Sequence, residues 1–236
     1  MKANRIRIPW TLLAFAMLFL VVLYVPYASA HNVSVEDARR IAGKTGWHFG
    51  LYAWLGAKHM YTGYDHLLFL LGVIFYLNSL RSIVLYVSLF SIGHSLTLII
   101  GVLGELNVNP FLVDAVIGFS VIYKGFDNLN GFQTAFGAPP PDERVAIGIF
   151  GLFHGLGLAT KLQELGLHAD GLVANLLSFN LGVELGQILA LTVIVLILKL
   201  LPAQTKQGGV GQAVNVGLML GGASLMFYQL LLYMEV

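Results

Sequence analysis

Long apolar stretches separated by short polar ones run along most of the chain. Six of them approach the ~20 residues that a helix needs to cross the hydrocarbon core of a bilayer. They lie at about residues 60–79, 82–103, 110–129, 145–164, 172–200 and 211–234. The connections are short except at 130–144, where Gly137 and three consecutive prolines interrupt any helix. The pattern predicts an all-α fold, a polytopic bundle of six transmembrane helices in one domain over 60–236.

The first thirty residues have the pattern of a secretory signal peptide. A basic start is followed by an apolar run at 11–25 and by Ala28-Ser29-Ala30, which fits a small-x-small cleavage site. Pro26 ends the helix just before this site, where a peptidase needs extended chain. We therefore expect residues 1–30 to be removed, which would leave His31 at the new N-terminus. A retained segment would instead add a seventh span.

Residues 31–59 are predicted to form an exported segment. It ends in an interfacial helix, because the aromatic residues between Trp47 and Trp54 are typical of the headgroup level. The loops near Arg81, near Arg144 and at 199–206 are basic and would lie in the cytoplasm, as the positive-inside rule requires. We therefore expect a multi-pass membrane protein with its mature N-terminus on the exported side.

Composition supports the membrane assignment and narrows the chemistry. Hydrophobic residues make up 57% of the 236 and charged residues 11%, whereas a soluble domain has about 25% charged residues. The mean hydropathy is +0.79. The chain has no cysteine, which excludes disulfides, thiolate metal sites and cysteine nucleophiles. A net charge of +1 gives no indication of a nucleic-acid partner.

Ionisable residues occur inside the predicted spans, where each costs ~2.5–3.5 kcal/mol or more and commonly marks function. The candidate metal ligands are His59, Asp65, His66, His94, His154 and Glu184. The supporting polar residues are Ser91, Ser95, Asp114, Asn180 and Gln187. Helical spacing places Asn180, Glu184 and Gln187 on one stripe, which must face the bundle interior because lipid offers it no partners. We expect His66, His94 and His154 to come close enough to share a metal ion.

Imidazoles and carboxylates without thiolates suit borderline divalent metals, here nickel, cobalt or zinc. Serine and asparagine in membrane helices are commonly hydrogen-bonding partners between helices, so these residues alone do not indicate a metal site. Three histidines inside the spans, with Asp65 and Glu184 at similar depth, favour a functional metal site over interhelical contacts.

Four motifs occur in order on successive helices. They are HMYTGYDHLLFLL at 59–71, GHSLTL at 93–98, GLFHGLG at 151–157 and FNLGVELGQ at 179–187. In these motifs the chain resembles the HupE/UreJ family of bacterial membrane proteins, especially its second, signal-bearing branch. The resemblance implies that the membrane is the inner (cytoplasmic) membrane of a bacterium. The resemblance implies nickel or cobalt uptake for hydrogenase and urease, with His59, Asp65 and His66 as ligands or part of the path. The chain departs from the nickel-permease branch after His154-Gly155, where no second histidine and acid follow, and it has Asp114 where relatives have glutamate.

Three functions are compatible with these residues. The first is a transition-metal transporter, which the resemblance favours over an enzyme. The second is an intramembrane metal-dependent hydrolase of lipids or membrane peptides, with His66, His94 and His154 as ligands and Glu184 or Asp65 as general base. The third is an accessory or metal-delivery subunit of a membrane metalloenzyme. The expected partners are the lipid bilayer and the metal ion, while a homo-oligomer or a complex with a metalloenzyme stays open.

Overall fold

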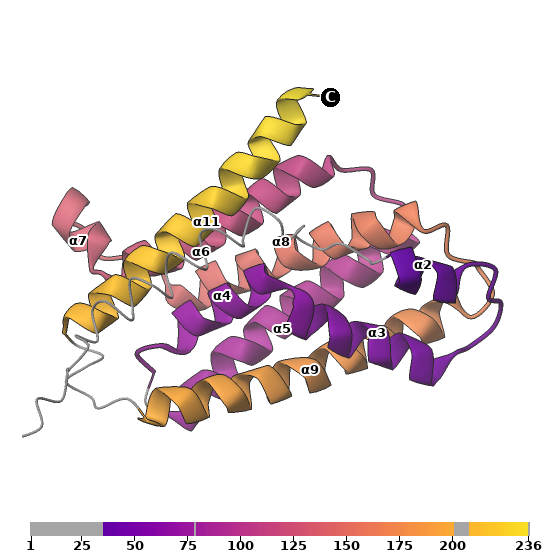
Figure 1. Cartoon of the computed structure of the whole chain (residues 1–236), viewed down its shortest axis with the longest axis horizontal. Helices are drawn as coiled ribbons and strands as arrows, with labels where there is room; N and C mark the ends of the chain where they lie inside the picture. Colours follow the sequence, from indigo (N-terminus) through magenta and orange to yellow (C-terminus); the bar gives the residue numbers. More distant parts are fainter. Residues whose placement is uncertain (1–34, 78, 201–207, 236) are drawn as a thin grey trace, which may run out of the picture.

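The protein is an elongated bundle of helices (Figure 1). The computed structural model describes residues 35–77, 79–200 and 208–235, so the predicted signal peptide and His31 lie outside the described residues. The helices are α2 (Val35–Ile41), α3 (Phe49–Thr62), α4 (Tyr64–Ile74), α5 (Leu80–Leu103), α6 (Pro110–Asn128), α7 (Gly131–Phe136), α8 (Glu143–Glu164), α9 (Leu172–Leu200) and α11 (Gly209–Glu235). The described part of the chain contains no strand, so the prediction of an all-α fold is confirmed.

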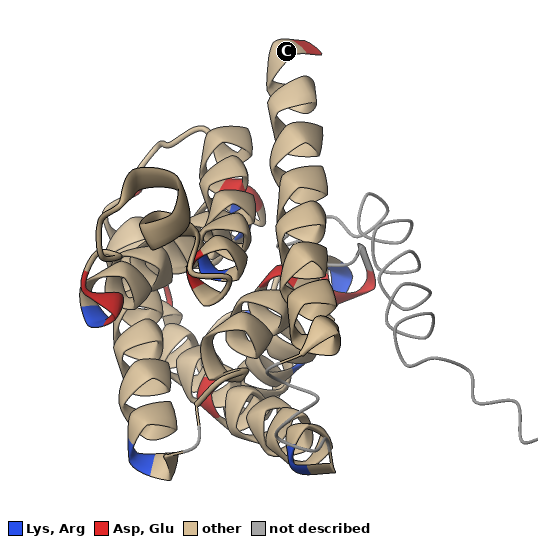
Figure 2. Ribbon diagram, turned by 90° about the vertical axis from the view of Figure 1, so that its left-hand side faces the viewer, with Lys and Arg blue, Asp and Glu red and all other residues tan. Residues whose placement is uncertain are grey.

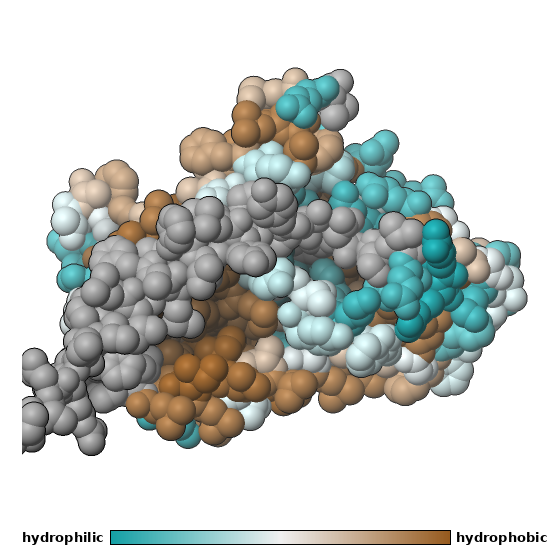
Figure 3. All heavy atoms as spheres, viewed as in Figure 1, coloured by the Kyte–Doolittle hydropathy of each residue, from teal (hydrophilic) through white to brown (hydrophobic). Residues whose placement is uncertain are grey.

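Among the described residues, four helices are long and apolar enough to cross a membrane, namely α5, α8, α9 and α11. The fifth long helix, α6, has 19 residues but carries Asp114, Lys124 and Asp127. Figure 2 shows long helical stretches without charged residues. In Figure 3 apolar side chains cover the lower surface along α9, whereas hydrophilic ones gather at the end that holds α2. These features are those of a helical membrane protein.

The first predicted span is a broken helix. Helix α3 has 14 residues and α4 has 11, and Gly63 between them has a ψ of 92°, far from helical values. The expectation of one helix over 60–79 is therefore wrong in its bounds, because helical structure begins at Phe49, breaks at Gly63 and ends at Ile74. Helix α3 begins within the aromatic stretch for which an interfacial helix is predicted, and it packs along α9.

The bundle is built from three closely packed helix pairs, α3 with α9, α5 with α8, and α6 with α11. Glycines let the backbones approach within each pair. A Cβ on Gly182 of α9 would collide with the Ala53 carbonyl of α3, and one on Gly118 of α6 would collide with the backbone of Met226 in α11. Helix α4 contacts α6 and lies among the three pairs, so the side chains at its start are surrounded by protein.

Candidate metal centre

The centre is built around the break at Gly63. Asp65 and His66 occupy the first turn of α4 and are 1% and 0% exposed. The His66 Nδ1 atom lies 3.2 Å from Asp65 Oδ1. A Cβ on residue 63 would lie 3.0 Å from His66 Nδ1 and 3.1 Å from Asp65 Oδ1, so glycine leaves room for both side chains. The side chains of Asp65 and His66 can therefore face the interior of the bundle without a side chain at residue 63 crowding them.

Three further histidines surround His66. The ring centroids lie 4.8 Å from His154, 5.0 Å from His59 and 5.6 Å from His94. His94 and His154 are 0% exposed and His59 is half-buried. The four imidazoles come from α3, α4, α5 and α8, so they meet only when these helices are packed together.

Ligand atoms fall into two groups that share His66. His59, His66 and His94 form one, and Asp65, His66 and His154 form the other, with all ligand atoms of a group within 4.8 Å of one another. Metal–ligand bonds are about 2 Å long, so each ligand atom would have to move by roughly 1 Å or less for either group to bind one ion. The expected trio of His66, His94 and His154 is thus split, because His94 and His154 approach His66 in different groups.

A backbone hydrogen bond orients His154. Its Nδ1 lies 2.8 Å from the Phe150 carbonyl oxygen, four residues earlier in α8. A carbonyl can only accept, so Nδ1 carries the proton and Nε2 keeps the lone pair that a metal needs. The geometry fits a divalent cation bound by neutral imidazoles and one carboxylate.

Aromatic rings close the centre on the side of α7. Phe90 lies 4.9 Å and Phe69 lies 5.5 Å from the His154 ring, and Phe150 lies 5.8 Å from Phe69. All three phenylalanines are buried. Phe69, Phe90 and Phe150 form what we call the aromatic plug. The side of the histidine cluster that faces α7 is therefore closed by apolar rings.

The other predicted polar residues do not join either ligand group. Glu184 is exposed on the outer face of α9, so the structure separates it from the histidines that the sequence placed beside it. Asp114 is buried, and its Oδ1 packs against Gly157 of α8.

Buried amides on α9 support the bundle beside the histidines. Gln187 accepts a hydrogen bond of 2.6 Å from Ser91 of α5, one turn from His94. Asn180 is buried on the same side of α9, whereas Ser95 is half-buried on α5. The Ser91–Gln187 bond ties α5 to α9 and thereby helps to hold His94 in place.

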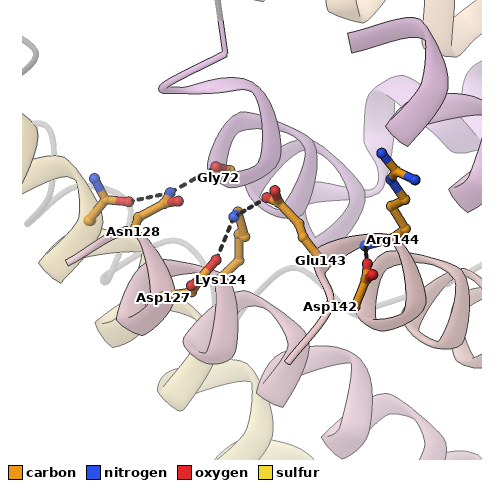
Figure 4. A network of polar contacts seen from close by, with 8 residues as sticks. Gly72, Lys124, Asp127, Asn128, Asp142, Glu143 and Arg144 are labelled. Carbon is orange, nitrogen blue, oxygen red and sulfur yellow. Dashed lines mark hydrogen bonds and ion pairs between the residues drawn. The ribbon is translucent and has the colours of Figure 1, made fainter. Parts of the chain in front are cut away.

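A network of ion pairs and amides joins the helices near α7 (Figure 4). Lys124 of α6 is 5% exposed, and its Nζ donates to Asp127 Oδ2 at 2.8 Å and to Glu143 Oε1 at 2.5 Å. Asn128 donates to the Gly72 carbonyl and to Asn215 Oδ1, both at 2.8 Å. The network links α4, α6, α8 and α11 and places a buried ammonium group beyond the aromatic plug.

Replacement of Lys124 by methionine is expected to lower the free energy of unfolding by about 3 kcal/mol, the lower end for a broken buried ion pair, because both carboxylates keep some exposure. The variant leaves two carboxylates close together without their cation, and loss of one member of a buried ion pair is strongly destabilising. The matched control is Lys161→Met, because its pair with Glu164 is longer, at 3.5 Å, and Glu164 is largely exposed. Unfolding in detergent micelles measures both, and equal losses in the two variants would contradict a special role for Lys124.

Sequence reasoning missed an ion pair on the opposite side of the centre. Asp37 of α2 is 4% exposed, and its Oδ2 accepts from Lys58 Nζ at 2.6 Å. Both residues line a cavity that also reaches His59. No periodic pattern connects residues 21 positions apart on two helices, so the sequence carried no signal for this pair.

A bundle of apolar, membrane-length helices with an internal cluster of histidines and a carboxylate defines a class of membrane protein with a candidate site for a divalent metal ion. The family model of the HupE / UreJ protein matches residues 35–235, and the chain belongs to the HupE/UreJ family. The match includes all five residues of the two ligand groups. Comparison with curated proteins and with solved structures finds no match.

Proposed function

We propose that this protein carries a nickel- or cobalt-type dication across the bacterial inner membrane. The observation that carries the proposal is the pair of ligand groups that share His66 inside the bundle. A cation can pass from one group to the other without losing His66, so neither step exposes a bare ion to the apolar interior. The association of the HupE/UreJ family with nickel and cobalt supports this choice of cargo.

The topology that we propose has six spans after removal of a signal peptide at residues 1–30. Helices α3 and α4 are each too short for a ~30 Å hydrocarbon core and cross it only together, as one broken span. Helix α6 is the remaining span, with its charged residues turned into the bundle. Arg81, Arg144 and Lys199 then lie on the cytoplasmic side with α7, and α2 lies on the exported side.

Transport in this scheme proceeds from His59 through His66 to His154. Asp65 supplies negative charge beside the shared imidazole, which offsets part of the charge of the ion. The aromatic plug then blocks the path, so the cycle requires that α4 or α8 move to open the cytoplasmic side. Gly63 is placed where such a movement would pivot, because it separates two helices that pack against different neighbours.

Metal retention and uptake measured side by side test this proposal. The protein and its His94→Ala variant are purified without chelators. Bound metal is measured by mass spectrometry, and uptake of radioactive nickel is measured after reconstitution into liposomes. We expect uptake well above that of empty liposomes in the parent protein and loss of most of it in the variant. Metal that is tightly held, lost in His94→Ala and never translocated would contradict a transporter.

That last result would support an intramembrane hydrolase. One specific observation favours this alternative: a group of three histidines, His59, His66 and His94, resembles the three-ligand arrangement of catalytic zinc sites. Asp65 is then the nearest carboxylate for a general base, whereas Glu184 is excluded by its position on the outer face of α9. A metal-delivery subunit differs from both, because its metal would leave only in the presence of a recipient enzyme.

A further inference from the structure

A cavity of about 150 Å³ lies between α2, α3, α8 and α9. The polar residues that line it are Asp37, Tyr52, Lys58, His59 and Thr62, and the other residues that line it are apolar. The volume holds several water molecules. In the proposed topology this cavity is on the exported side, directly outside the histidine centre.

Helix α2 places a carboxylate in this cavity. Ile41, on the same face one turn later, is buried and packs into the hydrophobic core, which fixes α2 over the cavity. Asp37 therefore points inward and is 4% exposed, whereas its neighbours Glu36 and Arg40 pair with each other at 2.6 Å on the exposed side.

Lys58 neutralises Asp37 from the other wall. The Nζ–Oδ2 distance is 2.6 Å, and the lysine side chain is 28% exposed. Removing two charges from water usually costs about as much as their attraction returns, so such a pair is weak evidence for a purely stabilising role. An ammonium group held on a carboxylate also marks a position where another cation can bind in its place.

His59 connects the cavity to the centre. It lines the cavity, and it belongs to the ligand group with His66 and His94. A cation in the cavity is therefore already beside the first imidazole of the internal path. No other residue of the two ligand groups lines this cavity.

We propose that this cavity is an outer loading site for a hydrated divalent cation. Asp37 and His59 are the ligands, and the incoming ion displaces the Lys58 ammonium group from Asp37. The inference rests on the proposed transport function. The dication binds Asp37 in competition with the Lys58 ammonium, keeps most of its water, and then exchanges water for imidazoles as it passes His59. Oxygen and nitrogen ligands in a wet cavity give the weak, reversible binding that a first site requires.

Two substitutions with opposite expected effects test the site. Asp37→Asn removes the anionic ligand, so the nickel concentration at half-maximal uptake should rise by about tenfold or more. Lys58→Gln removes the competitor, so the same concentration should fall by several-fold. Maximal uptake should stay within about twofold in both, because the internal centre is intact. Glu36→Gln, which alters an exposed acid on the same helix, is the matched control and should change neither quantity.

The direction of the two shifts separates a loading site from a structural ion pair. An ion pair that only holds α2 in place is broken equally by either substitution, so both variants would shift the same way. Shifts in the same direction, or no shift in either variant, overturn the loading site. The proposed function fails by a different result, namely uptake by the parent protein that is absent or insensitive to loss of His66 and His94.

Discussion

Replacement of His66 by alanine is expected to reduce metal binding at least about 100-fold and nickel uptake to the level of empty liposomes. His66 is the one residue that belongs to both ligand groups, so its loss removes a ligand from each and interrupts the path between them. His94→Ala leaves the group of Asp65, His66 and His154 complete. We therefore expect the His94 variant to keep part of the bound metal and the His66 variant to keep almost none.

Equilibrium dialysis with nickel or cobalt, followed by uptake in liposomes, measures both effects. His168→Ala is the matched control, because this histidine is exposed in the loop before α9 and belongs to neither group. Binding that survives in His66→Ala, or that falls as much in His168→Ala, would refute the shared-ligand centre. Retained helical circular dichroism would show that the variant protein is folded.

Substitution of Gly155 by alanine is expected to destabilise the bundle by about 3 kcal/mol, near the upper end for overpacked sites. The added methyl group would collide with the His94 carbonyl oxygen and with Thr97 Oγ1 of α5. Thr97 also donates to the Leu152 carbonyl of α8 at 2.7 Å, so the collision strains a hydrogen bond between the two helices. Separation of α5 from α8 moves His94 and His154 apart, so metal affinity should fall together with stability.

Gly148→Ala provides the control within the same helix. A Cβ at this position has nothing within 4 Å, so the variant should keep its metal affinity. Alanine is also favoured over glycine in a helix by up to about 1 kcal/mol, which predicts equal or higher stability. Unfolding in detergent and metal titration distinguish the two variants. Similar behaviour of both would show that close approach of α5 and α8 does not position the histidines.

The five long helices after residue 80 could be predicted from the sequence to within two residues at each end, whereas the short helix α7 was not predicted. Apolar length is a local property of the chain, and α9 begins and ends at the residues that the hydropathy pattern gave, Leu172 and Leu200. The break at Gly63 could not be predicted in this way. A single glycine in an apolar run is tolerated in most helices, and only the folded structure shows the side chains of Asp65 and His66 close against Gly63.

Helical spacing correctly places Glu184 close to Asn180 and Gln187 on α9, but the prediction that it faces the histidines is wrong. Relative to Asn180, a helix of 3.6 residues per turn places Glu184 about 40° to one side and Gln187 about 20° to the other. All three count as one stripe in the sequence, yet Asn180 and Gln187 are buried and Glu184 is exposed. The boundary of the buried face runs between them, and its position depends on how α3 and α5 pack against α9.

The sequence by itself determined that this protein is a bundle of membrane-spanning helices with imidazoles and carboxylates in its interior, because apolar length and the cost of polar groups in lipid are properties of each segment. Only the tertiary structure decided which of these groups meet. In the folded protein His66 belongs to two ligand groups, and Glu184 lies away from both. Asp37 pairs with Lys58 beside the cavity that reaches His59. These relations depend on the rotation and contact of helices distant in the chain, and no local pattern encodes them.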